Sequence, residues 1–447
     1  MAGRRGGTVA RRVLFWAILV FFISQPVVGQ ESTEAGLSAS EKSAVVEAVC
    51  RNLVREYIFP DITERYVKTL TENFETGKYD DIDDPQEFAS AITDDLAGVH
   101  EDRHLRIRFD PRWISEENNR KELDEAAVDR RAWRDRTRNY GWSKVEILPG
   151  NIGYLKLDSF SYEPAAYPIA AGAMSFLANT DALIVDLRSN GGGSPEMVQF
   201  LCSYFFDNPR KHLNSFTYRD PGRLTQYWTY TYLPGERLDR VALFVLTSEN
   251  TFSAAEEFAY NLQSMERAVV VGETTGGGAH DNKFVALNDR FMMSLPFARA
   301  VNPVTRDNWE EVGVQPDVEA SRDTALETAL ALAAESLSEQ DGPPYAQAYH
   351  AWHRDIYENN LHPPTVTEDT LQAYVGTYGP RMITLEGGSL FYQREGRAKM
   401  EMIPMGHDLF MFGEIDWFRL RFLREDDSVV AVEGLTPDGR NDMHRRN

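Results

Sequence analysis

Apolar residues recur at helical spacing through the first part of the chain. They do so between 41 and about 81 and again between 85 and 96, which predicts a small helical bundle over 38–99. The segment LRIRF at 105–109 alternates apolar and charged residues as a strand does, so the predicted N-terminal helical domain spans 38–110. A highly charged connector, 111–141, follows it.

From Trp142 onward, strand patterns alternate with helical patterns. Two strands flank a Pro-Gly-Asn turn at 149–151, and further strands are predicted at 182–187, 241–246, 268–271 and within 284–304. Helices are predicted at 165–177, 195–206, 253–265 and 324–337. This alternation favours an α/β core over 142–337, in which helices cover a parallel or mixed sheet.

The last part of the chain has a different character. Residues 338–367 combine Gly-Pro and Pro-Pro pairs with an aromatic stretch, which predicts a linker with one short helix. Short alternating segments separated by glycine turns then predict a small antiparallel β domain at 368–447, for which we expect a structural or binding role.

The N-terminus carries four arginines, Arg4, Arg5, Arg11 and Arg12, before an apolar run at 13–23. This run is too short to cross a bilayer comfortably, and small residues follow it up to Gly29. We therefore predict a secretory signal peptide at 1–29 and a periplasmic or extracellular protein. An uncleaved N-terminal anchor is the alternative, and membrane contact is expected through that segment alone.

The formal net charge of −22 argues against binding to nucleic acid or to anionic lipid by general electrostatics. Two cysteines occur, Cys50 and Cys202, each within an apolar helical pattern. Two buried thiols are the simpler interpretation, and one disulfide is the alternative that export would permit.

Candidate chemistry begins at Ser253, which stands where a predicted strand gives way to a predicted helix. A serine at such a junction can project its hydroxyl outward while the free N–H groups of the helix face a developing anion. The competing interpretation is a capping box, because Glu256 follows three residues later. Other segments have to decide between the two.

The strand at 182–187 runs into Arg-Ser-Asn-Gly-Gly-Gly at 188–193. Glycines at the end of a buried strand let the backbone approach a ligand closely. Neither GxGxxG nor a following Lys-Ser/Thr is present, so a dinucleotide or phosphate loop is excluded. An oxyanion hole from Gly191 or Gly192 together with Ala254 would use both segments.

A serine nucleophile requires a base. Only nine lysines occur, and none lies between Ser253 and Lys283, which leaves histidine as the expected base. The informative candidates are His100, His104 and His280. Residues 100–104 formally match HExxH, with His100, Glu101 and His104 as zinc residues, but a strand pattern follows immediately and no third ligand is evident, so no metal and no cofactor are expected.

An acid that orients the histidine is expected in NWEEVGV at 308–314, which contains Glu310 and Glu311. Such a carboxylate would fix the imidazole tautomer and stabilise its charged form. A solvated turn charge is the alternative, and spacing does not decide between them.

Five segments in this order resemble a known family: NYGWSKVEILPGNIGYLKLDSF, ALIVDLRSNGGG, VLTSENTFSAAEEFAY, RAVVVGETTGGGAH and NWEEVGVQPDV. They are similar to the serine peptidases that include C-terminal processing (tail-specific) proteases, the tricorn core protease and the repeats of interphotoreceptor retinoid-binding protein. The resemblance covers roughly 38–317 and is greatest to the tricorn-like and retinoid-binding-protein-like branch without a PDZ domain. It implies a crotonase-like β/α core with an N-terminal helical cap.

The resemblance also implies site residues. Ser253 matches the nucleophile of T-x-S-A-x-E, His104 the base of D-x-H, and Glu310 the acid of W-E-G-x-G-V, although Glu311 stands where glycine is usual. The lysine that processing proteases carry in G-K-G is replaced by the glycines 276–278. Accessory roles are expected for Asp102, for Glu311 and for His280, the rival base.

The expected function is therefore that of an exported serine endopeptidase or carboxyl-terminal-processing-like peptidase. A Ser-His-Glu triad would act through an acyl-enzyme on peptides or unfolded proteins. A non-catalytic protein that binds an apolar, retinoid-like ligand or a peptide on the same scaffold is the alternative.

Overall fold

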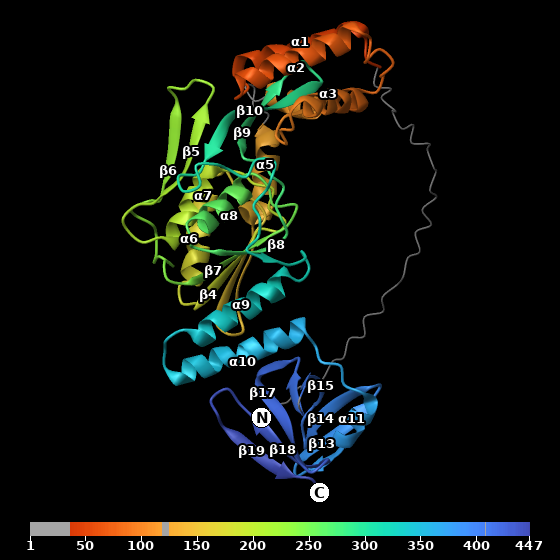
Figure 1. Cartoon of the computed structure of the whole chain (residues 1–447), viewed down its shortest axis with the longest axis vertical. Helices are drawn as coiled ribbons and strands as arrows, with labels where there is room; N and C mark the ends of the chain where they lie inside the picture. The colour runs from red at the N-terminus through yellow and green to blue at the C-terminus, as the bar shows by residue number, and fades with distance from the viewer. Residues whose placement is uncertain (1–35, 119–124, 407) are drawn as a thin grey trace, which may run out of the picture. The chain divides into compact units, whose positions relative to one another are not determined.

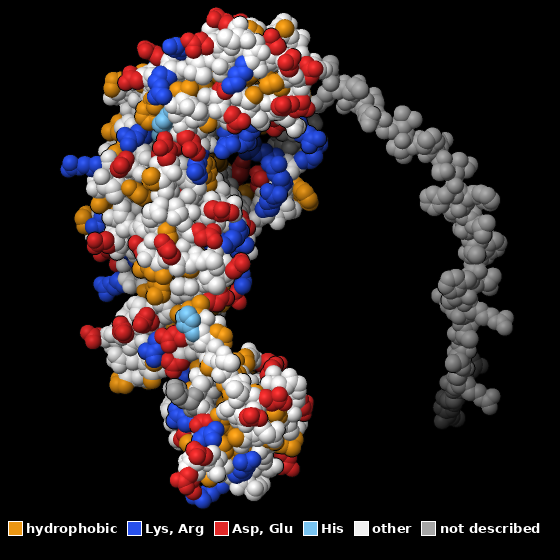
Figure 2. Space-filling model, turned by 45° about the vertical axis from the view of Figure 1, so that its right-hand side comes forward, with side chains coloured by type: hydrophobic (Ala, Val, Ile, Leu, Met, Phe, Trp, Pro, Cys, Tyr) orange, Lys and Arg blue, Asp and Glu red, His pale blue; other side chains and the backbone are white. Residues whose placement is uncertain are grey.

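The structure is a computed structural model that describes residues 36–118, 125–406 and 408–447. The predicted signal peptide at 1–29 lies outside these residues. Within the described ranges, no helix has the length and apolar character needed to cross a membrane. Figure 1 shows the chain, and in Figure 2 acidic and basic side chains are both spread over the visible face.

Three helices form where the first apolar patterns predict them: α1 (Ala39–Glu56), α2 (Pro60–Glu75) and α3 (Pro85–Val99). Ser38 caps α1, and the Asp84 carboxylate caps α3 by accepting the N–H groups of its first turn. Their apolar faces share a hydrophobic core with β1 (Arg106–Phe109) and with part of β10 (Phe291–Val301). The helices α4 (Pro111–Asn118) and α5 (Glu125–Thr137) lie in the charged connector.

A six-stranded sheet has the order β11-β8-β7-β4-β3-β2. Its strands are β2 (Trp142–Leu148), β3 (Ile152–Leu157), β4 (Ala182–Asp186), β7 (Ala242–Thr247), β8 (Val269–Gly272) and β11 (Val318–Glu319). All neighbours are parallel except β2, which is antiparallel to β3. The central strands are apolar on both faces because both faces are covered.

Helices on the two faces of this sheet belong to different hydrophobic cores. One core joins it to α6 (Ala166–Phe176), α7 (Pro195–Cys202) and α8 (Ala254–Ser264). The other joins it to α9 (Ala325–Glu339). The glycine segment after β4 and Ser253 after β7 therefore meet at the carboxyl edge of adjacent parallel strands, the usual place for a site in such sheets.

A second, antiparallel sheet contains β1, β10, β5 (His212–Tyr218), β6 (Leu224–Trp228) and β9 (His280–Ala286). The β5–β6 hairpin was not predicted, since its strands lack a clear apolar alternation. Pairing of β1 with β10, in which Arg106 lies opposite Ser294, attaches the residues that follow the N-terminal helices to the core. This pairing brings the Asp102–His104 turn to the site.

The expected linker contains an 18-residue helix, α10 (Pro344–Leu361), rather than a short one. It packs beside α9, and Tyr357 donates a hydrogen bond to the carbonyl of Pro149. The Arg419 guanidinium lies 3.8 Å from the ring centre of Trp352, which joins α10 to the C-terminal part. Buried aromatic residues thus stabilise a helix that flanking prolines made difficult to predict.

The C-terminal part is an eight-stranded antiparallel sheet, as the glycine-punctuated pattern predicts, preceded by α11 (Glu368–Tyr374). Its strands are β12 (Gly376–Tyr378), β13 (Arg381–Glu386), β14 (Ser389–Arg394), β15 (Lys399–Gly406), β16 (Leu409–Phe412), β17 (Ile415–Glu425), β18 (Ser428–Leu435) and β19 (Asn441–Arg445). A bridge between Tyr378 and Arg446 links the first strand to the chain end, which makes the sheet barrel-like. Cys50 and Cys202, which lie outside this part, are free thiols.

Candidate active site

Ser253 occupies a strained turn between β7 and α8. Its backbone has φ 57° and ψ −121°, a conformation that side-chain-bearing residues rarely adopt. Such strain persists only where the surroundings impose it, and it is the conformation of a nucleophile placed on a sharp strand-to-helix turn. A serine that merely caps a helix takes ordinary extended angles, as Ser38 and Ser194 do.

The Glu256 carboxylate is the group that fixes this turn. It accepts the Ser253 N–H at 2.7 Å, the Thr275 hydroxyl at 2.5 Å, and the N–H groups of Gly277 and Gly278 at 2.6 and 2.9 Å. Burial raises its pKa to about 7 although these four donors oppose the rise. The capping box predicted for Ser253 and Glu256 is therefore present, and the same carboxylate also positions the glycine loop.

The glycine segment after β4 lies against Ser253. A Cβ on Gly192 would come within 2.8 Å of the Ser253 Cβ and 3.1 Å of the Ala254 nitrogen, so only glycine fits there. The Gly192 N–H donates to the Asn190 side chain at 2.9 Å. Of the three predicted oxyanion donors, Gly192 therefore already has an acceptor in this state.

His104 lies in the turn between α3 and β1, and its backbone N–H donates to Asp102 at 3.1 Å. Its ring centre is 4.7 Å from that of Phe252, the residue before Ser253. The side chain is buried, and neither ring nitrogen has a hydrogen-bond partner among the described residues. Burial lowers its pKa to about 4, so the imidazole is neutral at pH 7.

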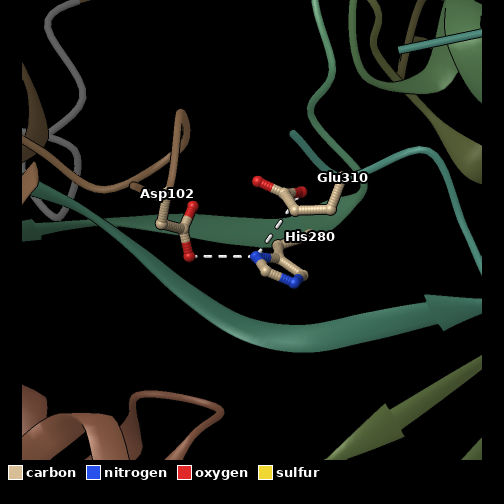
Figure 3. A group of neighbouring side chains, drawn as sticks. All are labelled: Asp102, His280 and Glu310. Atoms are coloured by element: carbon tan, nitrogen blue, oxygen red, sulfur yellow. Dashed lines mark hydrogen bonds and ion pairs between the residues drawn. The ribbon is translucent and has the colours of Figure 1, made fainter. Parts of the chain in front are cut away.

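His280 is held by two carboxylates (Figure 3). Its Nδ1 atom lies 2.9 Å from Asp102 Oδ2 and 3.6 Å from Glu310 Oε2. Burial lowers the pKa of His280, but the hydrogen bond and the charge of Asp102 outweigh it, and the pKa is raised. Tyr57 donates to the same Asp102 oxygen at 3.0 Å.

Glu310 does not make the predicted hydrogen bond to His104 in this state. Its Oε2 atom accepts the Ala279 N–H, while its buried Oε1 atom has no hydrogen-bond partner in the described part of the chain. Burial raises its pKa to about 7; the charge of His280 lowers it and that of Asp102 raises it. The neighbouring Trp309 is fixed by its own hydrogen bond to the Gly278 carbonyl.

The other sequence candidates fall at the margin of this site. The Glu311 side chain is half exposed, and its Oε1 atom lies 3.6 Å from Nδ1 of His100. Its φ of 64° is the conformation that glycine favours, which accounts for the glycine usual at this position. His100 is the C-cap residue of α3, so residues 100–104 do not form the continuous helix that HExxH requires.

Asp102, His280 and Glu310 could also hold a divalent metal ion. Their donor atoms lie within 4.8 Å of one another, and an imidazole with two carboxylates is a donor set that zinc accepts. These three residues are not the His100, Glu101 and His104 of the HExxH match.

Two positioning residues were missed from the sequence. Tyr57 gives no signal there because it occupies an apolar helical position. For Glu256, the capping-box spacing was the available signal, and it does not reveal the three donors of the distant loop.

Two parts of the chain match known protein families. The model of peptidase family S41 matches residues 151–320, and that of the N-terminal domain of this peptidase in eukaryotic IRBP matches residues 38–132. Carboxyl-terminal-processing peptidase 2, chloroplastic, of Arabidopsis thaliana is 30% identical over 184 residues, 39% of this chain and 34% of that protein. A carboxyl-terminal-processing protease of Synechocystis is 32% identical over 174 residues, 38% of each chain.

The chain thus spans little more than a third of the length of these curated relatives. Among solved structures, a photosystem II D1 C-terminal processing protease has a TM-score of 0.41 and 18% identity over 63% of this chain and 93% of that one. The first match contains Ser253, the glycine loop and Glu310, and the second contains Asp102 and His104. The chain belongs to peptidase family S41, with the family's N-terminal domain ahead of its peptidase domain.

Proposed function

We propose that this protein is a serine peptidase in which Ser253 attacks the carbonyl carbon of a peptide bond. The observation that carries the proposal is the strained backbone of Ser253 at the carboxyl edge of the parallel sheet. A helix cap alone gives no reason for this strain, whereas a nucleophile benefits from an exposed and fixed hydroxyl.

His104 is the proposed base and Glu310 the group that orients it. Three buried atoms lack hydrogen-bond partners near the nucleophile in the described residues: both ring nitrogens of His104 and Oε1 of Glu310. Buried polar atoms without partners are costly and call for an explanation. A Ser253–His104–Glu310 chain that closes when substrate binds would satisfy all three.

In the proposed reaction, the Ser253 Oγ forms a bond to the carbonyl carbon while its proton passes to His104. Collapse of the tetrahedral intermediate breaks the C–N bond, and His104 gives the proton to the leaving amine. A water molecule, which gives its proton to His104, then attacks the acyl carbon. The ester bond to Ser253 breaks, and His104 returns the proton to the Ser253 oxygen. The Ala254 N–H and the glycine segment would hold the oxyanion, with Gly192 exchanging its Asn190 acceptor for it.

His280 is the rival base. It is oriented by Asp102, and it lines the same small pocket as Ser253. A base held by a carboxylate is the arrangement that nucleophilic serine requires, so the two histidines have to be separated by substitution.

We further propose that the core is crotonase-like and that the protein is exported, acting on peptides or unfolded proteins. The sheet covered by helices on both faces supports the first point, and the arginine-rich, apolar N-terminus supports the second. The relatives named as carboxyl-terminal-processing enzymes support a substrate cut near its C-terminus.

A fluorophosphonate probe tests the proposal against the binding alternative. We expect stoichiometric labelling of the folded protein and its loss in Ser253→Ala. Ser143→Ala, which changes an exposed strand serine, is the matched control and should label normally. Absence of labelling in folded protein would favour a non-catalytic peptide- or apolar-ligand-binding protein.

A further inference from the structure

A pocket opens beside the nucleophile and carries an acidic wall. Its cavity volume is about 30 Å³, or about 330 Å³ when the open solvent at its mouth is counted, and it is lined by Ser253, Ala254, His280, Glu257 and Asp281 among others. The two acidic residues come from different elements, Glu257 from the first turn of α8 and Asp281 from the start of β9. Their position next to Ser253 and Ala254 is where a side chain flanking the scissile carbonyl would enter.

Glu257 is an unusual residue for a pocket wall. It is 3% exposed. The preceding residue, Glu256, accepts the Ser253 N–H and so belongs to the turn that carries the serine. Burial raises its pKa to about 8, and the charge of Asp281 raises it further, while the amides of Asn214 and Asn261 oppose the rise.

Other acidic groups act on the same space. Burial raises the pKa of Asp281 to about 6; the charge of Glu196 raises it further, and that of Arg223 lowers it. Burial, and after it the charges of Asp281, Glu196 and Glu257, raises the pKa of the neighbouring Tyr162 to about 12. The raised pKa values mean that the ionised forms of Glu257 and Asp281 lack a nearby cation, so the pocket favours a cation and disfavours an anion.

We propose that this pocket binds the side chain of a lysine or arginine that supplies the scissile carbonyl, with Glu257 and Asp281 as its partners. The inference rests on the proposed peptidase function and names its substrate class. An ammonium or guanidinium group would offset the cost of burying the Glu257 carboxylate and would be held by charge-assisted hydrogen bonds. An uncharged side chain of equal length leaves that carboxyl group without a cation.

The test compares peptidyl-lysine and peptidyl-norleucine fluorogenic amides that are otherwise identical. We expect kcat/KM to be at least tenfold higher for lysine. Glu257→Gln should bring the ratio close to one, and Asp281→Asn should lower it by a smaller factor. Glu249→Gln changes an exposed carboxylate outside the pocket and is the control that should keep the ratio.

Fluorophosphonate labelling separates failure of this inference from failure of the proposed function. Normal labelling of Ser253 with equal cleavage of both substrates would overturn the preference for a basic residue and leave the peptidase intact. Neither labelling nor cleavage in folded protein would overturn both. Normal labelling of Glu257→Gln also shows that this variant has folded, and Asp281→Asn gives an independent measure if it has not.

Discussion

The Glu256 carboxylate accepts the backbone N–H of Ser253 at 2.7 Å while it also holds the N–H groups of Gly277 and Gly278. One side chain thus fixes the nucleophile turn and the loop next to it. Glu256→Ala removes an acceptor from four buried or partly buried donors, and we expect it to lower the free energy of unfolding by about 3 kcal/mol. Urea unfolding measures this change, and Glu249→Ala should stay within about 0.5 kcal/mol of the original protein. Equal stability of the two variants would contradict this role of Glu256.

Substitution of the two histidines should separate the base from its neighbour. His104→Gln is expected to slow fluorophosphonate labelling by about 10²- to 10⁴-fold, the range for loss of a general base. His280→Gln should slow it by less than about tenfold, an effect on positioning alone. The reverse order of the two effects would assign the base to His280 and remove His104 from the proposed triad.

The pH profile of labelling provides a second distinction. Because burial lowers the pKa of His104 to about 4, the labelling rate should fall on acidification with a midpoint near that value. His280 has a raised pKa, so a base at that position would give a midpoint above the ordinary histidine value of about 6.5. Circular dichroism at each pH confirms that the protein measured is folded.

Stability should carry the same signature of His104. Between about pH 6.5 and about pH 4 the unfolded chain binds a proton at this histidine and the folded chain does not. Its contribution to stability is therefore complete above the unfolded pKa and is lost as the pH falls through this window. Between pH 7.5 and pH 5 we expect the protein to lose about 2 kcal/mol more unfolding free energy than His104→Gln, measured by urea unfolding. Parallel losses would show that His104 is not buried in its neutral form.

Gly278 is expected to be essential for the position of His104. A Cβ at this residue would lie 2.3 Å from the Phe252 ring and 2.6 Å from His104 Cε1, closer than atoms can approach. Gly278→Ala should therefore displace the imidazole and slow labelling at least tenfold. Gly172→Ala, on an open face of α6, is the matched control and should raise the stability by about 0.5–1 kcal/mol with unchanged labelling.

Removal of metal separates the serine mechanism from a zinc hydrolase. Exhaustive dialysis against a chelator should leave the labelling and cleavage rates unchanged. Added Zn²⁺ should inhibit reversibly, because coordination by Asp102, His280 and Glu310 would keep Glu310 from pairing with His104. Stoichiometric zinc in the isolated protein, with activity lost in chelator, would instead support metal-dependent hydrolysis.

The elements that carry the nucleophile could be predicted because their patterns are local. The buried strand β7 and the helix α8 are continuous signals, and the change between them marks Ser253. The helix α10 and the β5–β6 hairpin were harder, because prolines surround the first and polar residues interrupt the second. The helix α10 forms because it packs on α9, and the hairpin forms because β5 pairs with β10. Such long-range contacts do not appear in the local periodicity of the sequence.

Contacts within the site depend on pairings across long stretches of chain. Asp102 and His280 are 178 positions apart, and they meet because β1 and β9 both pair with β10. The sequence motif identified Asp102, His104 and Glu310 as candidates one by one. It did not show that Glu310 lies beside His280 instead of bonding to His104, since this depends on side-chain geometry within a few ångströms.

The hydrogen bond from Tyr57 in the N-terminal helical part to Asp102 has a bearing on when activity can arise. The proposed nucleophile Ser253 and the proposed base His104 lie in parts of the chain that are far apart in sequence and that must dock to form the site. A chain whose N-terminal helices have come loose from the core would carry Ser253 without its proposed base. Peptidase activity would then arise only after the N-terminal helices have docked on the core.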